Sequence, residues 1–198
     1  MKIKNVSFLK SCTNASQFPE FDYPEFAFFG RSNVGKSSLL NMILGQKNLV
    51  KIGSRPGVTK TINFFIVNDN RSFADMPGFG YAKLPMEIKK KLLPMIKEYI
   101  DKRENLRLAF LLIDIRRVPG DYERDIISML TNNKVSVAIT LTKCDKLSNN
   151  QRSKNISNIQ KALDISRDSI FLTSSETGEG KKELLILIDE FSEDAKKI

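Results

Sequence analysis

Residues 26–44, FAFFGRSNVGKSSLLNMIL, constrain the fold of this 198-residue chain more than any other segment. An apolar run ends at Gly30, small and polar residues follow, and a second apolar run begins after Lys36 and Ser37. The segment from Gly30 to Ser37 matches G-x-x-x-x-G-K-[ST], a loop whose backbone N–H groups surround phosphates between a strand and a helix. We therefore expect an α/β domain with a phosphate-binding loop.

The rest of the chain alternates strand and helix patterns. Strands are predicted at 23–30, 61–67, 72–76, 106–115, 135–142 and 169–174, and helices at 36–45, 86–101, 121–130, 150–163 and 181–195. Pro94 predicts a kink in the helix 86–101 or its division. The order predicts a doubly wound, three-layer α/β domain over residues 23–198, with a mostly parallel sheet and one antiparallel strand. Residues 1–22 are assigned to an N-terminal extension packed on it.

The composition excludes several kinds of site. Hydrophobic residues make up 41% of the chain and charged residues 28%, which is typical of a globular domain. No apolar run approaches the ~20 residues that span a bilayer, and the N-terminus has no apolar core of a signal peptide. With only two cysteines, a cytoplasmic protein without a disulfide framework or membrane partner is expected. The absence of histidine excludes Ser-His-Asp catalysis and His-ligated metals.

The positive charge lies in the first half of the chain. Residues 1–103 contain 17 Lys and Arg against 8 Asp and Glu, whereas residues 104–198 contain 15 of each. The excess includes a loop with Lys47, Lys51, Arg55 and Lys60, and the segment 83–103 with Lys83, Lys89, Lys90, Lys91, Lys97, Lys102 and Arg103. Two interpretations stay open: a surface that faces a polyanion such as RNA, or a solvated helix face.

The phosphate end of the site is predicted from three segments. In the loop, Lys36 supplies a charge to the β- and γ-phosphates, and the Ser37 hydroxyl is placed to bind Mg²⁺. Asp75 ends a strand and can hold the same Mg²⁺, while the Gly78 N–H can contact the γ-phosphate. The candidate contacts here are Gly30, Arg31, Ser32, Asn33, Val34, Gly35, Lys36, Ser37, Ser38, Asp75, Met76, Pro77 and Gly78.

The long loop 46–60 offers a threonine that binds Mg²⁺ only while the γ-phosphate is present, which is the basis of an order–disorder switch. Thr59 is favoured over Thr61, but the chemistry leaves both open. The candidate contacts in this segment are Gly57, Val58, Thr59, Lys60 and Thr61. Lys36, Thr59 and Gly78 are thus the candidate catalytic residues, and Ser37, Thr59 and Asp75 the candidate Mg²⁺ ligands.

Two later segments point to the base. Asp145 can accept hydrogen bonds from guanine N1–H and N2–H₂, which adenine does not offer, and the Lys143 stem can lie along the base. A backbone N–H near Ser175 can bond guanine O6. The candidate base contacts are Thr142, Lys143, Cys144, Asp145, Thr173, Ser174 and Ser175. The predicted ligand is therefore GTP or GDP rather than an adenine nucleotide.

A resemblance supports this reading. GRSNVGKSS, SRPGVTKTINFF, DMPGFGYAK, IDIRRVP, TKCD and SSETGEG resemble segments of the EngB family of bacterial ribosome-biogenesis GTPases, and the likeness spans about residues 6–190. It implies a G domain, Mg²⁺-dependent GTP hydrolysis, and a role in assembly of the large ribosomal subunit and in septation during cell division. The implied partners are the precursor of that subunit and its rRNA, not DNA, and the chain is expected to be a monomer. Thr142 stands where Asn is usual in the wider class, which is expected to remove an amide that braces the site.

Phe79 follows Gly78, where many GTPases have a Gln that orients the attacking water. We therefore expect slow intrinsic hydrolysis. Asn33 either helps to bind a K⁺ ion that assists hydrolysis or braces the loop. For Asp114, Arg116 and Arg117, capping and surface charge are favoured over a role of Arg116 as an arginine finger.

Three alternative functions stay open. The first is a P-loop ATPase or small-molecule kinase. The second is an RNA-binding module with negligible turnover, and the third is a regulatory GTPase at the division site.

Overall fold

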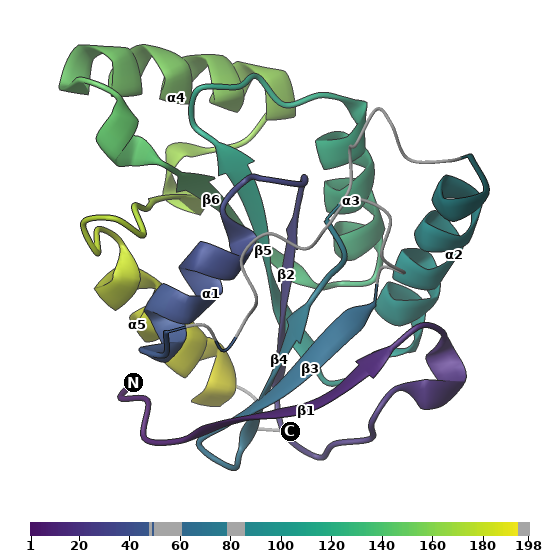
Figure 1. Ribbon diagram of the computed structural model, residues 1–198. Coiled ribbons are helices and arrows are strands. Elements are labelled where there is room, and N and C mark those ends of the chain that lie inside the picture. Colours follow the sequence, from purple (N-terminus) through teal and green to yellow (C-terminus); the bar gives the residue numbers. More distant parts are fainter. Residues whose placement is uncertain (48, 50–60, 79–85, 194–198) are drawn as a thin grey trace.

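The computed structural model describes residues 1–47, 49, 61–78 and 86–193, and for residues 86–91 only the backbone. A seven-stranded sheet forms its centre (Figure 1). The strands are β1 (Val6–Cys12), β2 (Glu25–Gly30), β3 (Ile62–Val67), β4 (Arg71–Asp75), β5 (Leu106–Asp114), β6 (Ser136–Thr142) and β7 (Ile170–Leu172). Their order in the sheet is β1-β3-β4-β2-β5-β6-β7.

Only β3 runs against the other described strands. It pairs antiparallel with β1 on one side and with β4 on the other, whereas β4, β2, β5, β6 and β7 pair parallel. The predicted sheet, mostly parallel with one antiparallel strand, is confirmed. Because β2, β4, β5 and β6 run the same way, their carboxyl ends meet at one edge of the sheet, where such folds bind ligands.

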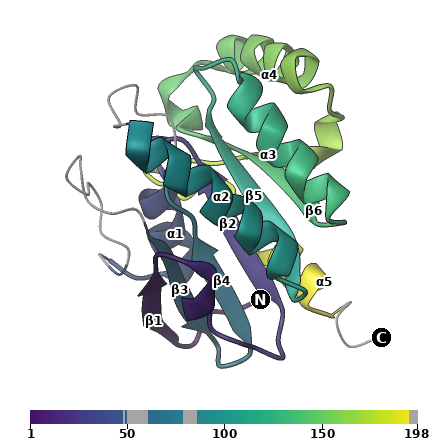
Figure 2. The same ribbon diagram turned by 90° about the vertical axis from the view of Figure 1, so that its right-hand side faces the viewer.

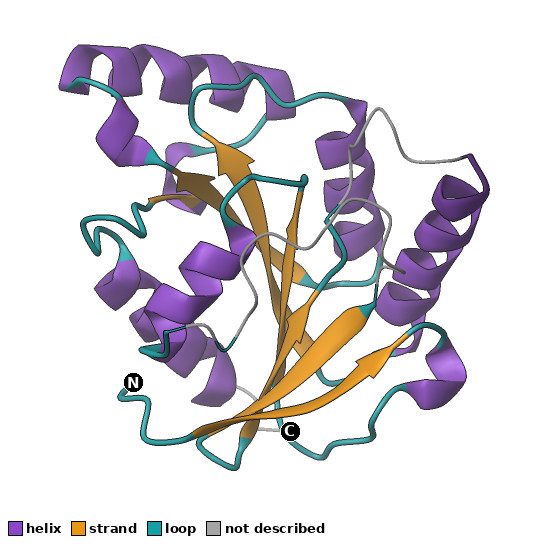
Figure 3. Ribbon diagram, viewed as in Figure 1, coloured by secondary structure: helices purple, strands orange, loops and turns teal. Residues whose placement is uncertain are grey.

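Helices cover both faces of the sheet (Figures 2 and 3). They are α1 (Lys36–Leu44), α2 (Met86–Lys102), α3 (Asp121–Asn132), α4 (Asn149–Leu163) and α5 (Lys181–Glu193), with short 3₁₀ helices η1 (Ala15–Gln17), η2 (Cys144–Lys146) and η3 (Arg167–Ser169). The buried residues of α1 and α5 pack on one face, and those of α2, α3 and α4 on the other. Among the described helices, none is both long and apolar enough to cross a bilayer.

The two central strands explain the continuous apolar runs in the sequence. Every residue of β2 is buried, and alternate side chains pack on opposite faces of the sheet. Phe26 and Phe28 face α1 and α5, whereas Ala27 and Phe29 face α2 and α3. Phe28 stacks on Phe110 of β5 with ring centroids 4.9 Å apart. This packing on both faces fixes the position of Gly30, where the phosphate loop begins.

The helix α2 continues through Pro94, so the alternative of a divided helix is wrong. Leu92, Ile96 and Tyr99 are buried along one side, whereas Pro94 is exposed. The proline removes one backbone hydrogen bond on the solvent side, and burial of the opposite face offsets that loss.

The N-terminal residues extend the sheet. The sequence pattern predicts no strand in residues 1–22, yet Val6–Cys12 forms β1 at the edge beside β3. Phe18 packs its ring against Phe64 and Tyr99. The pattern VSFLKSC lacks a regular apolar alternation, so this strand depends on the neighbouring edge of β3 rather than on its own sequence.

A buried carboxylate anchors the C-terminal end of α2. Glu25 at the start of β2 is fully buried and accepts hydrogen bonds from the Tyr99 hydroxyl at 2.7 Å and from the Ser72 hydroxyl at 2.9 Å. Arg103 donates to both oxygens of Glu25, at 2.8 and 2.7 Å, and its side chain is only 7% exposed. The assignment of Arg103 to a surface that faces RNA is therefore wrong, because this guanidinium is needed inside the protein.

Candidate functional site

The loop between β2 and α1 has the geometry that its sequence predicts. Gly35 directly precedes α1 with φ 106°, a left-handed conformation that strains other residues. A Cβ on Gly30 would lie 2.9 Å from Val34 Cγ1 and 3.1 Å from Leu112, so no side chain fits there. The first N–H groups of α1, from Lys36 to Ser38, lie at the end of this loop. A helix N-terminus after such a loop is a site for phosphate.

The two charged groups of the predicted phosphate end lie together. Asp75 ends β4 and is paired in register with Phe28 of β2, which places its carboxylate beside the loop. The Lys36 ammonium hydrogen-bonds to this carboxylate, and both side chains are almost fully buried. Asn63 of β3 donates to the other Asp75 oxygen at 3.4 Å. The structure thus brings Lys36 and Asp75, both candidate residues of the phosphate end, into direct contact.

Gly78 lies directly against the phosphate loop. A Cβ on Gly78 would lie 3.2 Å from Ser32 Oγ and 3.3 Å from Ser32 Cα. The Ser32 hydroxyl is 3.4 Å from the Gly78 carbonyl oxygen. Met76 and Pro77, which connect Asp75 to Gly78, are buried. This close approach places the Gly78 backbone beside the loop that is predicted to bind phosphate.

Thr61 is one of the two threonines proposed to reach the metal. Its hydroxyl donates to Asn63 Oδ1 at 2.9 Å, and Ser11 of β1 donates to the same oxygen at 2.6 Å. These bonds fix the amide of Asn63, whose Nδ2 points to Asp75. The other predicted residues of this segment, Gly57, Val58, Thr59 and Lys60, lie outside the described residues, as do Phe79 and Lys83.

The predicted Mg²⁺ ligands fit that ion by their chemistry. The Ser37 hydroxyl and the Asp75 carboxylate supply oxygen atoms, and Mg²⁺ is commonly held by one or two protein oxygens together with substrate phosphates and water. In the described part of the chain, no group of three or more His, Cys, Asp or Glu side chains could hold a metal alone. A Mg²⁺ ion at this site would take its remaining ligands from phosphate oxygens and water.

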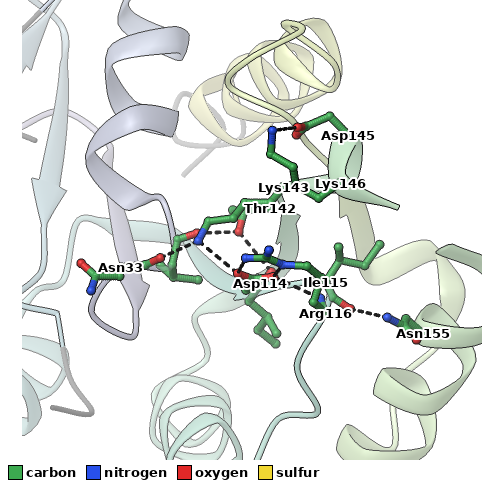
Figure 4. Close-up of polar contacts among 11 residues, drawn as sticks. Asn33, Asp114, Ile115, Arg116, Thr142, Lys143, Asp145, Lys146 and Asn155 are labelled. Atoms are coloured by element: carbon green, nitrogen blue, oxygen red, sulfur yellow. Dashed lines mark hydrogen bonds and ion pairs between the residues drawn. The ribbon is translucent and has the colours of Figure 1, made fainter. Parts of the chain in front are cut away.

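Thr142 and Lys143 connect the end of β6 to the phosphate loop (Figure 4). The Thr142 hydroxyl donates to the Val34 carbonyl oxygen at 2.6 Å, and Lys143 Nζ donates to the Asn33 carbonyl oxygen at 2.7 Å. Thr142 lacks the amide that Asn would supply at this position, but its hydroxyl bonds the loop itself. Lys143 Nζ also lies 3.1 Å from Asp114 Oδ2.

Asp114, for which the sequence favours capping or surface charge, lies against Lys143 of the candidate site. It ends β5 and accepts hydrogen bonds from Arg116 Nε at 2.9 Å and Nη2 at 2.7 Å. Burial alone would raise the pKa of Asp114, but the bonds from Arg116 and Lys143 hold that pKa well below its usual range. The ionised carboxylate orients Lys143, and the Arg116 guanidinium is engaged here rather than at the phosphates.

Asp145 is held in place by two neighbours. Lys146 Nζ lies 2.8 Å from Oδ2, and the Ser174 hydroxyl donates to Oδ1 at 2.6 Å. Both interactions lower the pKa of Asp145, so it is a carboxylate at neutral pH. Ser174 Oγ in turn accepts weak hydrogen bonds from the backbone N–H groups of Glu176 and Thr177, both at 3.2 Å. The two predicted base-binding segments thus meet at Asp145 and Ser174.

Cys144 and Thr173 join these segments from inside. The backbone N–H of Cys144 donates to the Thr173 carbonyl oxygen at 3.2 Å, and the Thr173 hydroxyl donates to the Leu141 carbonyl oxygen at 3.0 Å. Burial raises the pKa of the Cys144 thiol to about 11, which keeps it protonated. Both side chains are buried, so they support the site through packing.

Known proteins are similar to this chain in sequence and in structure. The family described as 50S ribosome-binding GTPase matches residues 25–143. A probable GTP-binding protein EngB from Desulforapulum autotrophicum is 47% identical over 184 residues, which cover 93% of this chain and 95% of the relative. The chain belongs to the EngB family of GTP-binding proteins. Another EngB, from Geobacter sp. strain M21, is 43% identical over 96% of this chain and 88% of its own length.

A solved structure agrees with this assignment. A probable EngB protein superposes with a TM-score of 0.71 and 26% identity, covering 86% of this chain and 99% of its own. The G domain of the Thermotoga maritima FeoB iron transporter is also similar, with a TM-score of 0.52 and 28% identity over 85% of this chain. Membership of the EngB family establishes a P-loop GTPase fold and supports the binding and hydrolysis of GTP.

Several residues that support the site were not found from the sequence. Asn63 holds Asp75, Asp114 orients Lys143, and Arg152 of α4 reaches the base-binding segments. Of these three residues, only Asp114 could have been found from the sequence, because it lies at the end of an apolar run that forms a buried strand. The others act through contacts between segments distant in sequence.

Proposed function

We propose that this protein is a Mg²⁺-dependent GTP switch that hydrolyses GTP slowly and acts in assembly of the large ribosomal subunit, with a consequence for septation. The observation that carries the nucleotide part is the direct connection between the two halves of the site. Thr142 and Lys143 bond the phosphate loop at Val34 and Asn33, and Asp145 follows them in the same turn. A guanine at Asp145 and phosphates on the loop are then parts of a single ligand.

The residues have separate tasks in this proposal. Lys36 neutralises charge on the β- and γ-phosphates, and Ser37 and Asp75 hold Mg²⁺, which neutralises charge that builds up during phosphoryl transfer. Gly78, which lies against Ser32, contacts the γ-phosphate through its N–H and responds when that phosphate leaves. Lys36 must exchange its bond to Asp75 for bonds to phosphate, so nucleotide binding releases the carboxylate for the metal.

A potassium ion is proposed to assist hydrolysis, because Phe79 cannot orient water by a hydrogen bond. Asn33 is exposed, and its backbone carbonyl accepts a hydrogen bond from Lys143. We expect GTP turnover to be about tenfold faster in potassium than in sodium buffer, since a cation at the phosphates replaces part of an arginine finger.

The variant Asn33→Gly tests the side chain, because glycine tolerates the φ of 63° at this position. It should turn over GTP equally in both buffers and keep the GDP affinity of the wild-type protein. Equal wild-type turnover in sodium and potassium would contradict the role of potassium.

The ribosomal part of the proposal is supported by the family description as 50S ribosome-binding GTPases and by the positive charge of residues 1–103. Within the basic segment 83–103, two exposed lysines already have carboxylate partners. Lys97 pairs with Asp101 and Lys102 with Glu98, so their charges are largely compensated. Lys89, Lys90 and Lys91 are the remaining candidates on α2, which follows the γ-phosphate contact at Gly78. We place this protein, as a monomer, on ribosomal particles in the cytoplasm.

Capture of ribosomal particles tests this proposal. The wild-type protein should capture large-subunit particles better with a non-hydrolysable GTP analogue than with GDP. The triple charge reversal K89E/K90E/K91E should reduce capture by about tenfold at low salt and weaken its salt dependence, because fewer phosphates are neutralised. The matched reversal K97E/K102E should have a smaller effect.

GTP affinity of both variants should equal that of the wild-type protein. Capture that is independent of nucleotide and salt would contradict the switch and favour the RNA-binding module with negligible turnover. Equal affinity for GDP and ADP would instead favour the P-loop ATPase.

A further inference from the structure

Arg152 lies in the first turn of α4, behind the turn that carries Asp145. The capping box at the start of this helix sets its position, since Gln151 Oε1 accepts hydrogen bonds from the backbone N–H and the hydroxyl of Ser148, both at 3.0 Å. From this turn, Arg152 Nε donates to the Cys144 carbonyl oxygen at 2.7 Å. Cys144 is the residue directly before Asp145, so Arg152 holds the backbone from which the base-binding carboxylate extends.

The same guanidinium also holds the second base-binding segment. Arg152 Nη1 donates to Glu179 Oε1 at 2.9 Å, and the two side chains are 21% and 34% exposed. The backbone carbonyl of Glu179 accepts a hydrogen bond from the Ser174 N–H at 3.1 Å. Glu179 therefore connects Arg152 to Ser174, whose hydroxyl bonds Asp145.

These contacts form a closed ring. It runs from Asp145 to Ser174, on to Glu179, through Arg152 to Cys144, and back along the chain to Asp145. Glycine at position 180 keeps Glu179 in the ring, because a Cβ there would lie 2.1 Å from the Leu172 carbonyl oxygen, and φ is 81°. The loop can therefore follow β7 closely only with glycine at this position.

We propose that Arg152, together with Glu179, is a positioning residue for recognition of the guanine base. It contacts no part of the base. It fixes the distance between the Asp145 carboxylate and the backbone near Ser175, so that the N1–H and N2–H₂ donors and the O6 acceptor of one base are recognised together. This inference rests on the proposed guanine site and adds residues that control its specificity.

The contacts of Arg152 are expected to affect the position of the base-binding groups more than the stability of the fold. A partly exposed ion pair contributes little to the stability of the fold, so a purely structural role predicts a small and uniform effect. The paired hydrogen bonds from guanine N1–H and N2–H₂ to a carboxylate depend on direction and weaken steeply when the acceptor rotates. Release of the ring should therefore weaken the binding of guanine more than that of a base with one of these donors.

Inosine diphosphate is the matched probe, because it is GDP without the 2-amino group. We expect Arg152→Gln to bind GDP about tenfold more weakly than the wild-type protein, equivalent to one lost hydrogen bond. The loss for inosine diphosphate should be clearly smaller, so the preference for GDP over inosine diphosphate falls. Glu179→Gln should move this preference in the same direction, and Arg152→Lys should restore it in part.

Arg124→Gln is the control. Arg124 is also partly exposed, bonds a carboxylate at Asp121 and donates to the Ala162 carbonyl oxygen of α4, but it has no contact with the ring. It should keep both affinities of the wild-type protein. Thermal unfolding of all variants identifies a general loss of stability.

An Arg152→Gln protein with the wild-type preference for GDP over inosine diphosphate would overturn the inference, whether or not its melting temperature falls. A wild-type protein that binds GDP and ADP equally would show instead that the proposed guanine site is wrong. The two failures are therefore distinguishable in one set of titrations.

Discussion

An Asp145→Asn protein is expected to bind GDP on the order of a thousandfold more weakly than the wild-type protein, because a buried polar mismatch at a base-reading group is costly. The carboxylate accepts two hydrogen bonds from guanine, whereas an amide presents a donor to one of the same positions. Xanthosine diphosphate carries an oxygen in place of the 2-amino group. It should bind the variant more tightly than the wild-type protein.

The measurement is competition of GDP, xanthosine diphosphate and ADP against a fluorescent nucleotide. Asp121→Asn is a suitable control, since Asp121 is an exposed carboxylate in the first turn of α3 and pairs with Arg124. It should leave all three affinities unchanged. If the Asp145→Asn protein kept its affinity for GDP and gained none for xanthosine diphosphate, Asp145 would not be the group that recognises the guanine base.

The sequence predicts which candidate residues lie together where those residues directly follow a buried strand. The loop after β2, Asp75 after β4 and Asp145 after β6 each follow a buried strand, and parallel strands place these ends at one edge. The apolar runs are long enough to identify those strands without tertiary information. For this reason, the position of the site follows from the pattern alone.

The supporting contacts depend on tertiary structure, and the sequence pattern does not contain them. Asn63 reaches Asp75 across the antiparallel pair of β3 and β4, and Arg152 reaches Glu179 across 27 positions of the chain. The sequence shows that Thr142 lacks the amide of an Asn, but it does not show what the Thr142 hydroxyl bonds. Its hydroxyl reaches Val34 because β6, β5 and β2 are neighbours in the sheet.

The same reason explains the errors at the start of the chain and at Arg103. β1 depends on pairing with β3 at the edge of the sheet, so the sequence of β1 alone, without regular apolar alternation, does not predict it. Arg103 looks like one more basic residue of a lysine-rich helix, but Glu25, 78 positions earlier, is buried directly beside it. The net charge therefore overestimates how many cations are available to bind RNA. In the structure Arg103 is buried, whereas Lys97 and Lys102 are exposed.

Glu25→Ala is expected to lower the free energy of unfolding by about 3–5 kcal/mol, because it leaves a buried Arg103 charge without its partner. The Tyr99 and Ser72 hydroxyls lose their acceptor in the same step. This anchor fixes the end of α2, while the start of α2 follows the predicted γ-phosphate contact. Glu25→Ala should therefore lower the stability of the protein but change its affinity for GDP little. The candidate nucleotide site lies at the opposite ends of the strands.

Urea unfolding measures this change as a shift of the midpoint with an unchanged slope. Glu98→Ala, which breaks an exposed pair with Lys102 on the same helix, is the control and should change stability by less than about 1 kcal/mol. The double variant E25A/R103M should lose less stability than the sum of the two single variants, because removal of both charges leaves none unpaired. A loss for Glu25→Ala as small as that for Glu98→Ala would show that the charge of Arg103 reaches solvent, and Arg103 would then again be a candidate for the surface that binds RNA.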